Sequence, residues 1–240
     1  MNILFAGSSK SSSRILEFLS KEKSIKINGV LTQPDKRRKR GPDLFESEVS
    51  KTANSFNQKI FKPNNLNDKD FEKEITKLQI DLIIVIAYGR IIPNWMLALP
   101  KIMSMNVHFS ILPKYRGASP IQSSLINGDK ETGVSFMQMT EGLDEGDLIL
   151  TASMLINEED NKISLETKLT DLAIKNILNV LTHLENKSAS ITKQDNSVAT
   201  YCRKINSEDS ITDFNDYAEN IINKFKAYFE WPGRSFIYKD

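Results

Sequence analysis

Asn106 and His108 are separated by one residue in a short extended stretch, and both side chains can take part in chemistry. Alternate residues of a strand point to the same face, so the two side chains can converge on one point. An acyl transfer needs donors for an oxyanion, which an amide supplies, and a proton relay near neutral pH, which an imidazole supplies. The pair is therefore a candidate site for acyl transfer, although an isolated Asn-x-His pair is more often a hydrogen-bonded strand end.

An acidic turn with the sequence GLDEGD, at residues 142–147, supplies a third candidate. Asp144 is the best placed of its acids, because the glycines at 142 and 146 let the backbone fold close to a ligand. A carboxylate at this position can orient the imidazole of His108. Asn106, His108 and Asp144 are therefore the predicted catalytic residues.

Strands that alternate with helices must position these side chains. The run Asp81–Ala87 (DLIIVIA) is apolar on both faces, which is typical of a strand buried inside a parallel sheet. Further strands are predicted at residues 2–6, 27–31, 104–108, 132–139 and 148–155. Helices are predicted at residues 11–19, 46–56, 71–78, 120–126, 163–184 and 213–228. The pattern predicts an α/β fold with a doubly wound, mostly parallel sheet, whose ligands bind beyond the carboxyl ends of the strands.

The composition is that of a globular protein and excludes several classes. Of the 240 residues, 40% are hydrophobic and 26% are charged, and the net charge is +1. No apolar run approaches the roughly 20 residues that span a bilayer, and the N-terminus lacks a secretion signal. A cytoplasmic protein with no membrane partner is therefore expected. The single cysteine, Cys202, excludes an internal disulfide and a cysteine-rich zinc site, and no metal is expected.

The polar stretch between Gln194 and Ser210 is the best candidate domain boundary. Residues 1–195 are predicted to form the catalytic domain, and residues 196–240 a linker with a short C-terminal helical appendage.

Serines at positions 8, 9 and 11–13 follow the first predicted strand. A phosphate pocket there is one interpretation, but helix capping is favoured because the spaced glycines of a dinucleotide fingerprint are missing. No nicotinamide cofactor is implied.

A longer match surrounds the Asn106 and His108 pair. The segment Asn106–Gln122 (NVHFSILPKYRGASPIQ) resembles the signature of folate-dependent formyltransferases, specifically of the methionyl-tRNA formyltransferase family. The resemblance extends from Met1 to about Tyr238. The other matching segments, in the family's order, are 32–35, 87–93, 133–139, 142–147, 199–201 and 231–233.

This resemblance implies a Rossmann-like formyltransferase fold, with Asn106, His108 and Asp144 as the catalytic residues. It implies that 10-formyltetrahydrofolate is the formyl donor, that the amino group of initiator methionyl-tRNA is the acceptor, and that the product supports translation initiation. The protein is expected to act as a monomer. The residues implied to bind the reduced folate are Ser110, Ile111, Leu112, Pro113, Arg90, Ile91 and Ile92.

Two other functions stay open at this point. One is an amine formyltransferase that acts on a nucleotide-linked amino sugar or on glycinamide ribonucleotide with the same catalytic residues. The other is a catalytically decayed protein that only binds folate or RNA. Members of the resembled family continue into a C-terminal barrel that helps to hold tRNA, so residues 196–240 are expected to contain the truncated start of that domain.

Five consecutive cations, Lys36, Arg37, Arg38, Lys39 and Arg40, follow the second predicted strand. Charge runs are commonly solvated loops. A loop after a parallel strand, however, lies at the ligand-binding edge of the sheet. The resembled family uses its loop at this place to enter the tRNA acceptor stem, which implies that Lys36–Arg40 binds tRNA.

Overall fold

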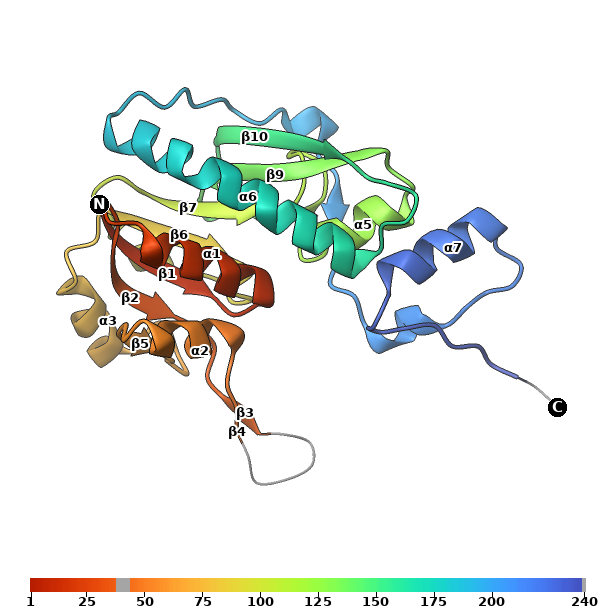
Figure 1. The fold of residues 1–240 in the computed structure, drawn as a ribbon, viewed down its shortest axis with the longest axis horizontal. Helices are drawn as coiled ribbons and strands as arrows, with labels where there is room; N and C mark the ends of the chain where they lie inside the picture. Colours follow the sequence, from red (N-terminus) through yellow and green to blue (C-terminus); the bar gives the residue numbers. More distant parts are fainter. Residues whose placement is uncertain (38–43, 239–240) are drawn as a thin grey trace.

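The computed structural model describes residues 1–37 and 44–238 of the chain. A seven-stranded sheet forms its centre, with the strand order β10-β9-β7-β6-β1-β2-β5 (Figure 1). The parallel strands are β1 (Asn2–Gly7), β2 (Lys26–Leu31), β5 (Ile60–Phe61), β6 (Leu82–Ile86) and β7 (Met103–His108). β9 (Glu131–Gln138) runs antiparallel to β7, and β10 (Leu148–Leu155) antiparallel to β9.

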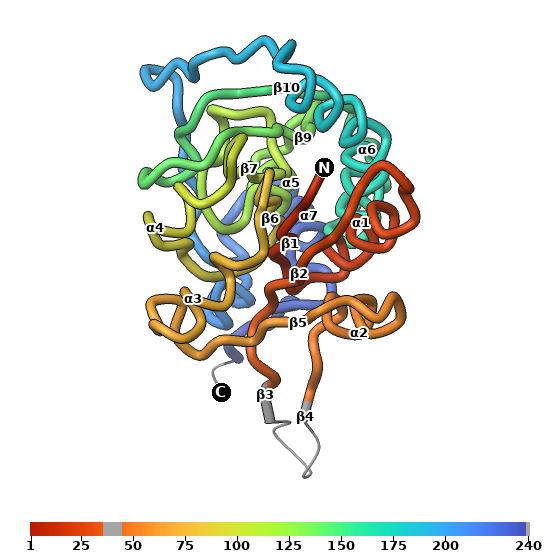
Figure 2. Tube along the Cα trace, turned by 90° about the vertical axis from the view of Figure 1, so that its left-hand side faces the viewer, coloured from red at the N-terminus to blue at the C-terminus, as the bar shows by residue number. Residues whose placement is uncertain are grey.

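Helices cover both faces of this sheet (Figure 2). One face carries α1 (Lys10–Lys21), α2 (Glu48–Ser55), α5 (Pro120–Ile126) and α6 (Lys162–Glu185), and the other carries α3 (Lys69–Thr76) and α4 (Asn94–Leu97). In β6, Leu82, Ile84 and Ile86 belong to the first core, whereas Ile83 and Val85 belong to the second. The strand is apolar throughout because both of its faces are buried. The predicted doubly wound, mostly parallel α/β sheet is confirmed.

The serines after β1 tie α1 to its surroundings. Ser9 caps α1, because its hydroxyl accepts a hydrogen bond from the backbone N–H of Ser12 at 3.1 Å. Ser12 Oγ donates to the carbonyl of Ile86 at 2.6 Å, and Ser11 Oγ donates to Glu166 at 2.5 Å. The helix-capping interpretation is therefore confirmed for Ser9, whereas Ser11 and Ser12 bind groups outside the helix.

Short elements lie outside the central sheet. β3 (Lys36–Arg37) pairs with β4 (Leu44–Phe45), and β8 (Arg116–Gly117) pairs in parallel with β11 (Tyr201–Cys202). Two 3₁₀ turns, Asn196–Val198 and Ser207–Ser210, flank β11. None of these elements shows a hydrophobic period, so the sequence did not predict them.

The last helix, α7 (Ala218–Ala227), packs against α5 and is shorter than the predicted 213–228. Two aspartates explain the difference. Asp213 Oδ1 accepts from the N–H of Asn215 at 2.9 Å, and Asp216 Oδ1 accepts from the N–H of Tyr217 at 2.9 Å. Such local bonds between side chain and backbone compete with the helix, so the segment stays a turn until Tyr217.

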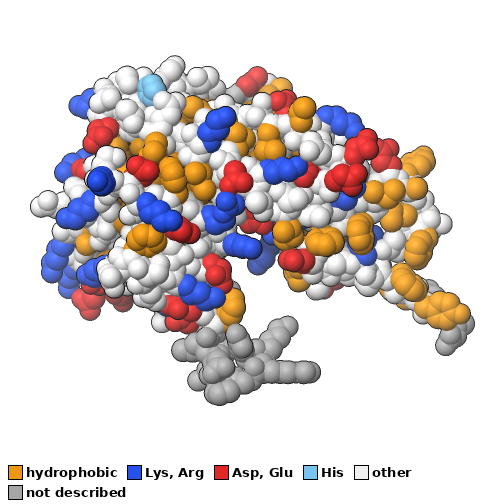
Figure 3. All heavy atoms as spheres, in the orientation of Figure 1, with side chains coloured by type: hydrophobic (Ala, Val, Ile, Leu, Met, Phe, Trp, Pro, Cys, Tyr) orange, Lys and Arg blue, Asp and Glu red, His pale blue; other side chains and the backbone are white. Residues whose placement is uncertain are grey.

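Most of the exposed aromatic side chains in the described part of the chain lie on α7 or beside it. Figure 3 shows hydrophobic side chains gathered over this end of the molecule. Two pairs meet edge to face, Phe225 with Phe229 and Phe214 with Phe236. Along residues 1–37 and 44–238, no helix combines the length and the apolar character needed to cross a bilayer.

Candidate active site

Asn106 and His108 lie at the carboxyl end of β7, between β6 and β9. Val85 of β6 pairs with Asn106, and Ser135 of β9 pairs with His108. The intervening Val107 belongs to the core under α1 and α6, so Asn106 and His108 point to the other face of the sheet. Alternate strand residues lie roughly 7 Å apart, close enough for both side chains to contact one small group.

The imidazole of His108 is held between a carbonyl and a carboxylate. His108 is buried, with 6% of its surface exposed. Its Nε2 lies 2.9 Å from the carbonyl oxygen of Tyr115, and because a carbonyl only accepts, Nε2 carries the hydrogen. Nδ1 lies 3.7 Å from Asp144 Oδ2, which is longer than a hydrogen bond. Nδ1 is therefore the ring nitrogen that can exchange a proton with a bound molecule.

Asp144 occupies the middle of the predicted acidic turn. Its φ of +50° is a left-handed conformation, which aspartate tolerates better than most residues. Its Oδ2 accepts a hydrogen bond from the backbone N–H of Gly117 at 2.8 Å. The turn also needs Gly146, because a Cβ at that position would lie 1.9 Å from the carbonyl oxygen of Gln138. The structure thus brings Asp144 Oδ2 to 3.7 Å from His108 Nδ1.

The amide of Asn106 differs from its neighbours in having no partner. Asn106 is half-buried, and within the described residues its side chain makes no hydrogen bond. Ser104, on the same face of β7, does make one, since its hydroxyl donates to the carbonyl of Leu97 at 3.0 Å. An unpaired amide beside the His108 imidazole is free to donate to a ligand.

The predicted folate-binding loop, residues 110–113, is tightly fixed. Ser110 and Leu112 are buried, and the Ser110 hydroxyl donates a hydrogen bond to the carbonyl of Lys114 at 2.6 Å. Ser135 of β9 accepts from the N–H of Leu112 and donates to the carbonyl of Ser110. Ile111 and Pro113 are only half-buried. A ligand at this loop would therefore meet the backbone and these two side chains rather than the serine hydroxyl.

The other predicted folate-binding residues follow β6, the neighbour of β7. Arg90 donates to the backbone carbonyls of Pro63 and Asn64, at 2.6 and 2.5 Å. Ile91 is 92% exposed, whereas Ile92 is 5% exposed and belongs to the core under α3 and α4. Of the three, only Ile91 therefore presents a large free side chain.

The predicted tRNA-binding segment is described only at its start. Lys36 and Arg37 form β3, which projects from the sheet beside α2 (Figure 1), whereas Arg38, Lys39 and Arg40 lie outside the described residues. Asp35, just before β3, and Glu46, just after β4, both form ion pairs with Lys62 Nζ, at 2.8 and 3.1 Å. Partial burial opposes the charge of Lys62, but the hydrogen bonds to the two carboxylates raise its pKa above the ordinary value.

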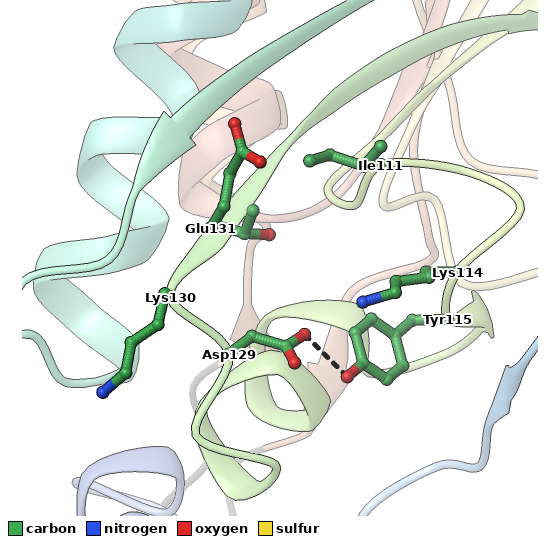
Figure 4. Close-up of a pocket in the computed structure, with 7 residues that line it drawn as sticks. Ile111, Lys114, Tyr115, Asp129, Lys130 and Glu131 are labelled. Carbon is green, nitrogen blue, oxygen red and sulfur yellow. Dashed lines mark hydrogen bonds between the residues drawn. The ribbon is translucent and has the colours of Figure 1, made fainter.

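A cavity of about 390 Å³ lies beside the loop that follows β7 (Figure 4). The residues that line it are Ile111, Lys114, Tyr115, Asp129, Lys130, Glu131 and Thr132. The Tyr115 hydroxyl donates to Asp129 at 2.7 Å. Burial, with a contribution from that carboxylate, raises the pKa of Tyr115 to about 12. The hydroxyl therefore acts as a hydrogen-bond donor here, and none of Asn106, His108 and Asp144 lines this cavity.

Gly117 and Cys202 complete the site, although neither of them was predicted from the sequence to have a role in it. Gly117 has a φ of +118°, and a Cβ there would lie 2.2 Å from the carbonyl oxygen of Cys202. The thiol of Cys202 donates to the carbonyl of Tyr115 at 3.3 Å, the same oxygen that receives the His108 hydrogen. Burial raises the pKa of this thiol, in agreement with a structural role. No group of three or more metal-binding side chains occurs among the described residues.

A family model described as formyl transferase matches residues 1–181. A methionyl-tRNA formyltransferase of Buchnera aphidicola subsp. Baizongia pistaciae is 38% identical over 232 residues, which cover 97% of this chain and 71% of that protein. A methionyl-tRNA formyltransferase of Kosmotoga olearia is 37% identical over 233 residues, which cover 97% and 75%.

Solved structures show the same fold at low identity. A 4-N formyltransferase from Francisella tularensis has a TM-score of 0.76 and 17% identity, covering 99% of this chain and 93% of that one. WlaRD, a sugar 3N-formyl transferase crystallised with dTDP and 5-N-formyl-THF, has a TM-score of 0.70 and 22% identity, covering 95% and 78%. At these identities the likeness concerns the fold alone.

Proposed function

Because this chain belongs to the formyl transferase family, we propose that it transfers a formyl group from 10-formyltetrahydrofolate to the amino group of methionyl-tRNA. The main support is the identity of 37–38% to methionyl-tRNA formyltransferases along 97% of the chain. The approach of His108 to Asp144 beside the unpaired amide of Asn106 supports the same chemistry. Residues 1–195 are proposed as the catalytic domain, and residues 196–240 as the start of a further domain.

The proposed reaction has one tetrahedral intermediate and no covalent bond to the protein. The amine nitrogen attacks the formyl carbon, the carbonyl oxygen becomes an oxyanion, and the bond from that carbon to the folate nitrogen then breaks. Asn106 donates its side-chain N–H to the oxyanion. The attacking amine loses one proton and the departing folate nitrogen gains one. His108 relays this proton through Nδ1, where the Asp144 carboxylate stabilises it.

The folate donor is proposed to lie along the loop at residues 110–113, with its pterin ring against residues 90–92. The exposed Ile91 offers an apolar side chain for a flat ring, and the loop offers backbone groups. Both segments follow the carboxyl ends of neighbouring strands, β6 and β7, where ligands of doubly wound sheets bind.

A direct assay tests this function. The purified protein is incubated with 10-formyltetrahydrofolate and charged initiator tRNA, and formyl-methionine is measured by mass spectrometry. Formation of the product supports the proposal. If no product forms with methionyl-tRNA but a nucleotide-linked amino sugar or glycinamide ribonucleotide is formylated, the proposed acceptor is wrong and the proposed formyl transfer still holds.

We expect alanine replacement of all five cations at residues 36–40 to weaken tRNA binding and to flatten its salt dependence. Each lysine or arginine that neutralises a phosphate releases counterions, and each lost contact lowers the slope of log affinity against log salt by roughly one unit. Titration of tRNA at several salt concentrations measures both quantities.

The matched control for that variant neutralises Lys69 and Lys73 on α3 and Lys77 just after it, which also lowers the positive charge. This control should keep the salt slope of the unchanged protein. Folate binding should persist in both variants. Equal tRNA affinity and slope in the variant at residues 36–40 and the unchanged protein would show that the segment is only a solvated loop.

A further inference from the structure

Arg116 is a fully buried cation next to the candidate catalytic residues. It is 1% exposed, and among the described residues no carboxylate forms an ion pair with it. Its guanidinium donates to Gln194 Oε1 through Nε at 3.1 Å and through Nη2 at 2.8 Å, and Nη2 also donates to Asn196 Oδ1 at 2.7 Å. An arginine stays charged in proteins, so these amide oxygens stabilise a charge that burial makes costly.

These contacts fix the orientation of the Gln194 amide. Arginine only donates, so the oxygen of Gln194 must face Arg116. The Gln194 nitrogen then donates to two backbone carbonyls of the acidic turn, that of Asp144 at 2.9 Å and that of Gly146 at 2.7 Å. One amide thus links the buried cation to the backbone of the residue that faces His108.

The backbone on both sides of Arg116 holds the same catalytic residues. The carbonyl of Tyr115, just before it, receives the hydrogen of His108 Nε2, and the N–H of Gly117, just after it, donates to Asp144 Oδ2. Arg116 itself is fixed by β8, since its N–H donates to the carbonyl of Thr200 at 2.9 Å. Gln194 therefore ties the acidic turn to the same segment, residues 115–117, that holds the imidazole of His108.

We propose that Gln194, oriented by the buried Arg116, is a positioning residue that holds the turn at residues 142–147 so that the Asp144 carboxylate faces His108. Gln194 does not touch the reacting atoms and acts through Asp144. The catalytic part of this inference rests on the proposed formyl transfer.

Replacement Gln194→Glu separates this role from the stabilisation of Arg116. A carboxylate still accepts from the guanidinium, but it has no N–H for the carbonyls of Asp144 and Gly146. Small displacements of catalytic groups can cost up to about 100-fold in rate, so we expect kcat of Gln194→Glu to fall by about 10- to 100-fold. KM for the folate donor and the midpoint of thermal unfolding should change much less.

The matched control is Asn196→Asp. It makes the same change from amide to carboxylate beside the same guanidinium, but no hydrogen bond joins the Asn196 side chain to the turn. Its kcat should stay near that of the unchanged protein. If Gln194→Glu unfolds at a lower temperature than Asn196→Asp, the kcat values of both variants are compared at a temperature at which both are folded, with the same expectation.

A spectroscopic measurement tests the positioning without the reaction. The chain has two histidines, and His183 lies exposed in the last turn of α6. In a His183→Gln background, the only histidine ring signal in a proton–carbon NMR spectrum is therefore that of His108. In that background we expect the signal to move in Gln194→Glu and to stay in Asn196→Asp. The NMR measurement does not depend on the acceptor. If the unchanged protein formylates no methionyl-tRNA, only the proposed function is overturned. An unchanged signal and kcat in Gln194→Glu, or equal losses in both variants, would overturn the positioning role.

Discussion

Turnover of formyl transfer is expected to fall about 100- to 1000-fold in Asn106→Ala, because removal of one oxyanion donor typically costs that much. The side-chain amide of Asn106 makes no hydrogen bond within the described residues, so its loss breaks no hydrogen bond of the fold. The thermal midpoint should therefore stay close to that of the unchanged protein. Steady-state kinetics with saturating folate and acceptor measure kcat.

Two further variants sharpen this experiment. Asn106→Asp keeps the shape of the side chain but places an acceptor where the oxyanion forms, so its kcat should be no higher than that of Asn106→Ala. Asn28→Ala removes an amide of β2 that donates to the carbonyl of Leu78, far from the site in the sheet order. It should keep full turnover. Near-normal kcat in purified Asn106→Ala would refute the role of Asn106 as a donor.

The second large effect is expected for Asp144→Asn, with a loss of turnover on the order of 10,000-fold, by analogy with acids that orient a catalytic histidine. Asparagine tolerates the left-handed backbone at φ +50° and its oxygen can still accept from the N–H of Gly117. The turn should therefore persist while the charge that faces His108 Nδ1 disappears. A single-turnover measurement of product formation reports this loss directly.

Asp147→Asn is the matched control, because it removes a charge from the same turn without touching His108. It should retain turnover close to that of the unchanged protein. If Asp144→Asn and Asp147→Asn behave alike, the charge of Asp144 has no special part in the reaction.

The long elements of the fold could be predicted from the sequence because each has a clear hydrophobic pattern. The apolar run at residues 81–87 is β6, and the helical spacing at residues 163–184 is α6. β5, β8 and β11 have two residues each, too few to show any period. Their pairing is decided by partners elsewhere in the chain, which a single sequence does not display.

The candidate site also has a part that the sequence predicts and a part that depends on residues far apart in the chain. The approach of His108 to Asp144 follows from strand alternation and from a turn at the sheet edge, and both were visible in the sequence. Neither strand alternation nor turn composition indicates that Gln194 joins Arg116 to that turn, because the two residues are 78 positions apart. The burial of Ser110 and Leu112 was also invisible, since it depends on Ser135 of β9.

The pairing of β8 with β11 has a consequence for the order in which the protein becomes complete during synthesis. Tyr115 and Thr200, whose hydrogen bond borders this pair, are 85 residues apart. At about 5–20 residues per second, a ribosome needs roughly 4–17 seconds to make that interval. The central sheet and the helices up to α6 can pack together during this time. The N–H groups of Tyr115 and Arg116 still face water then, because their partner Thr200 has not been made. The nascent chain therefore has most of its core before the loop that holds His108 and Asp144 is closed, and this edge of the candidate site is among the last parts to reach the final conformation.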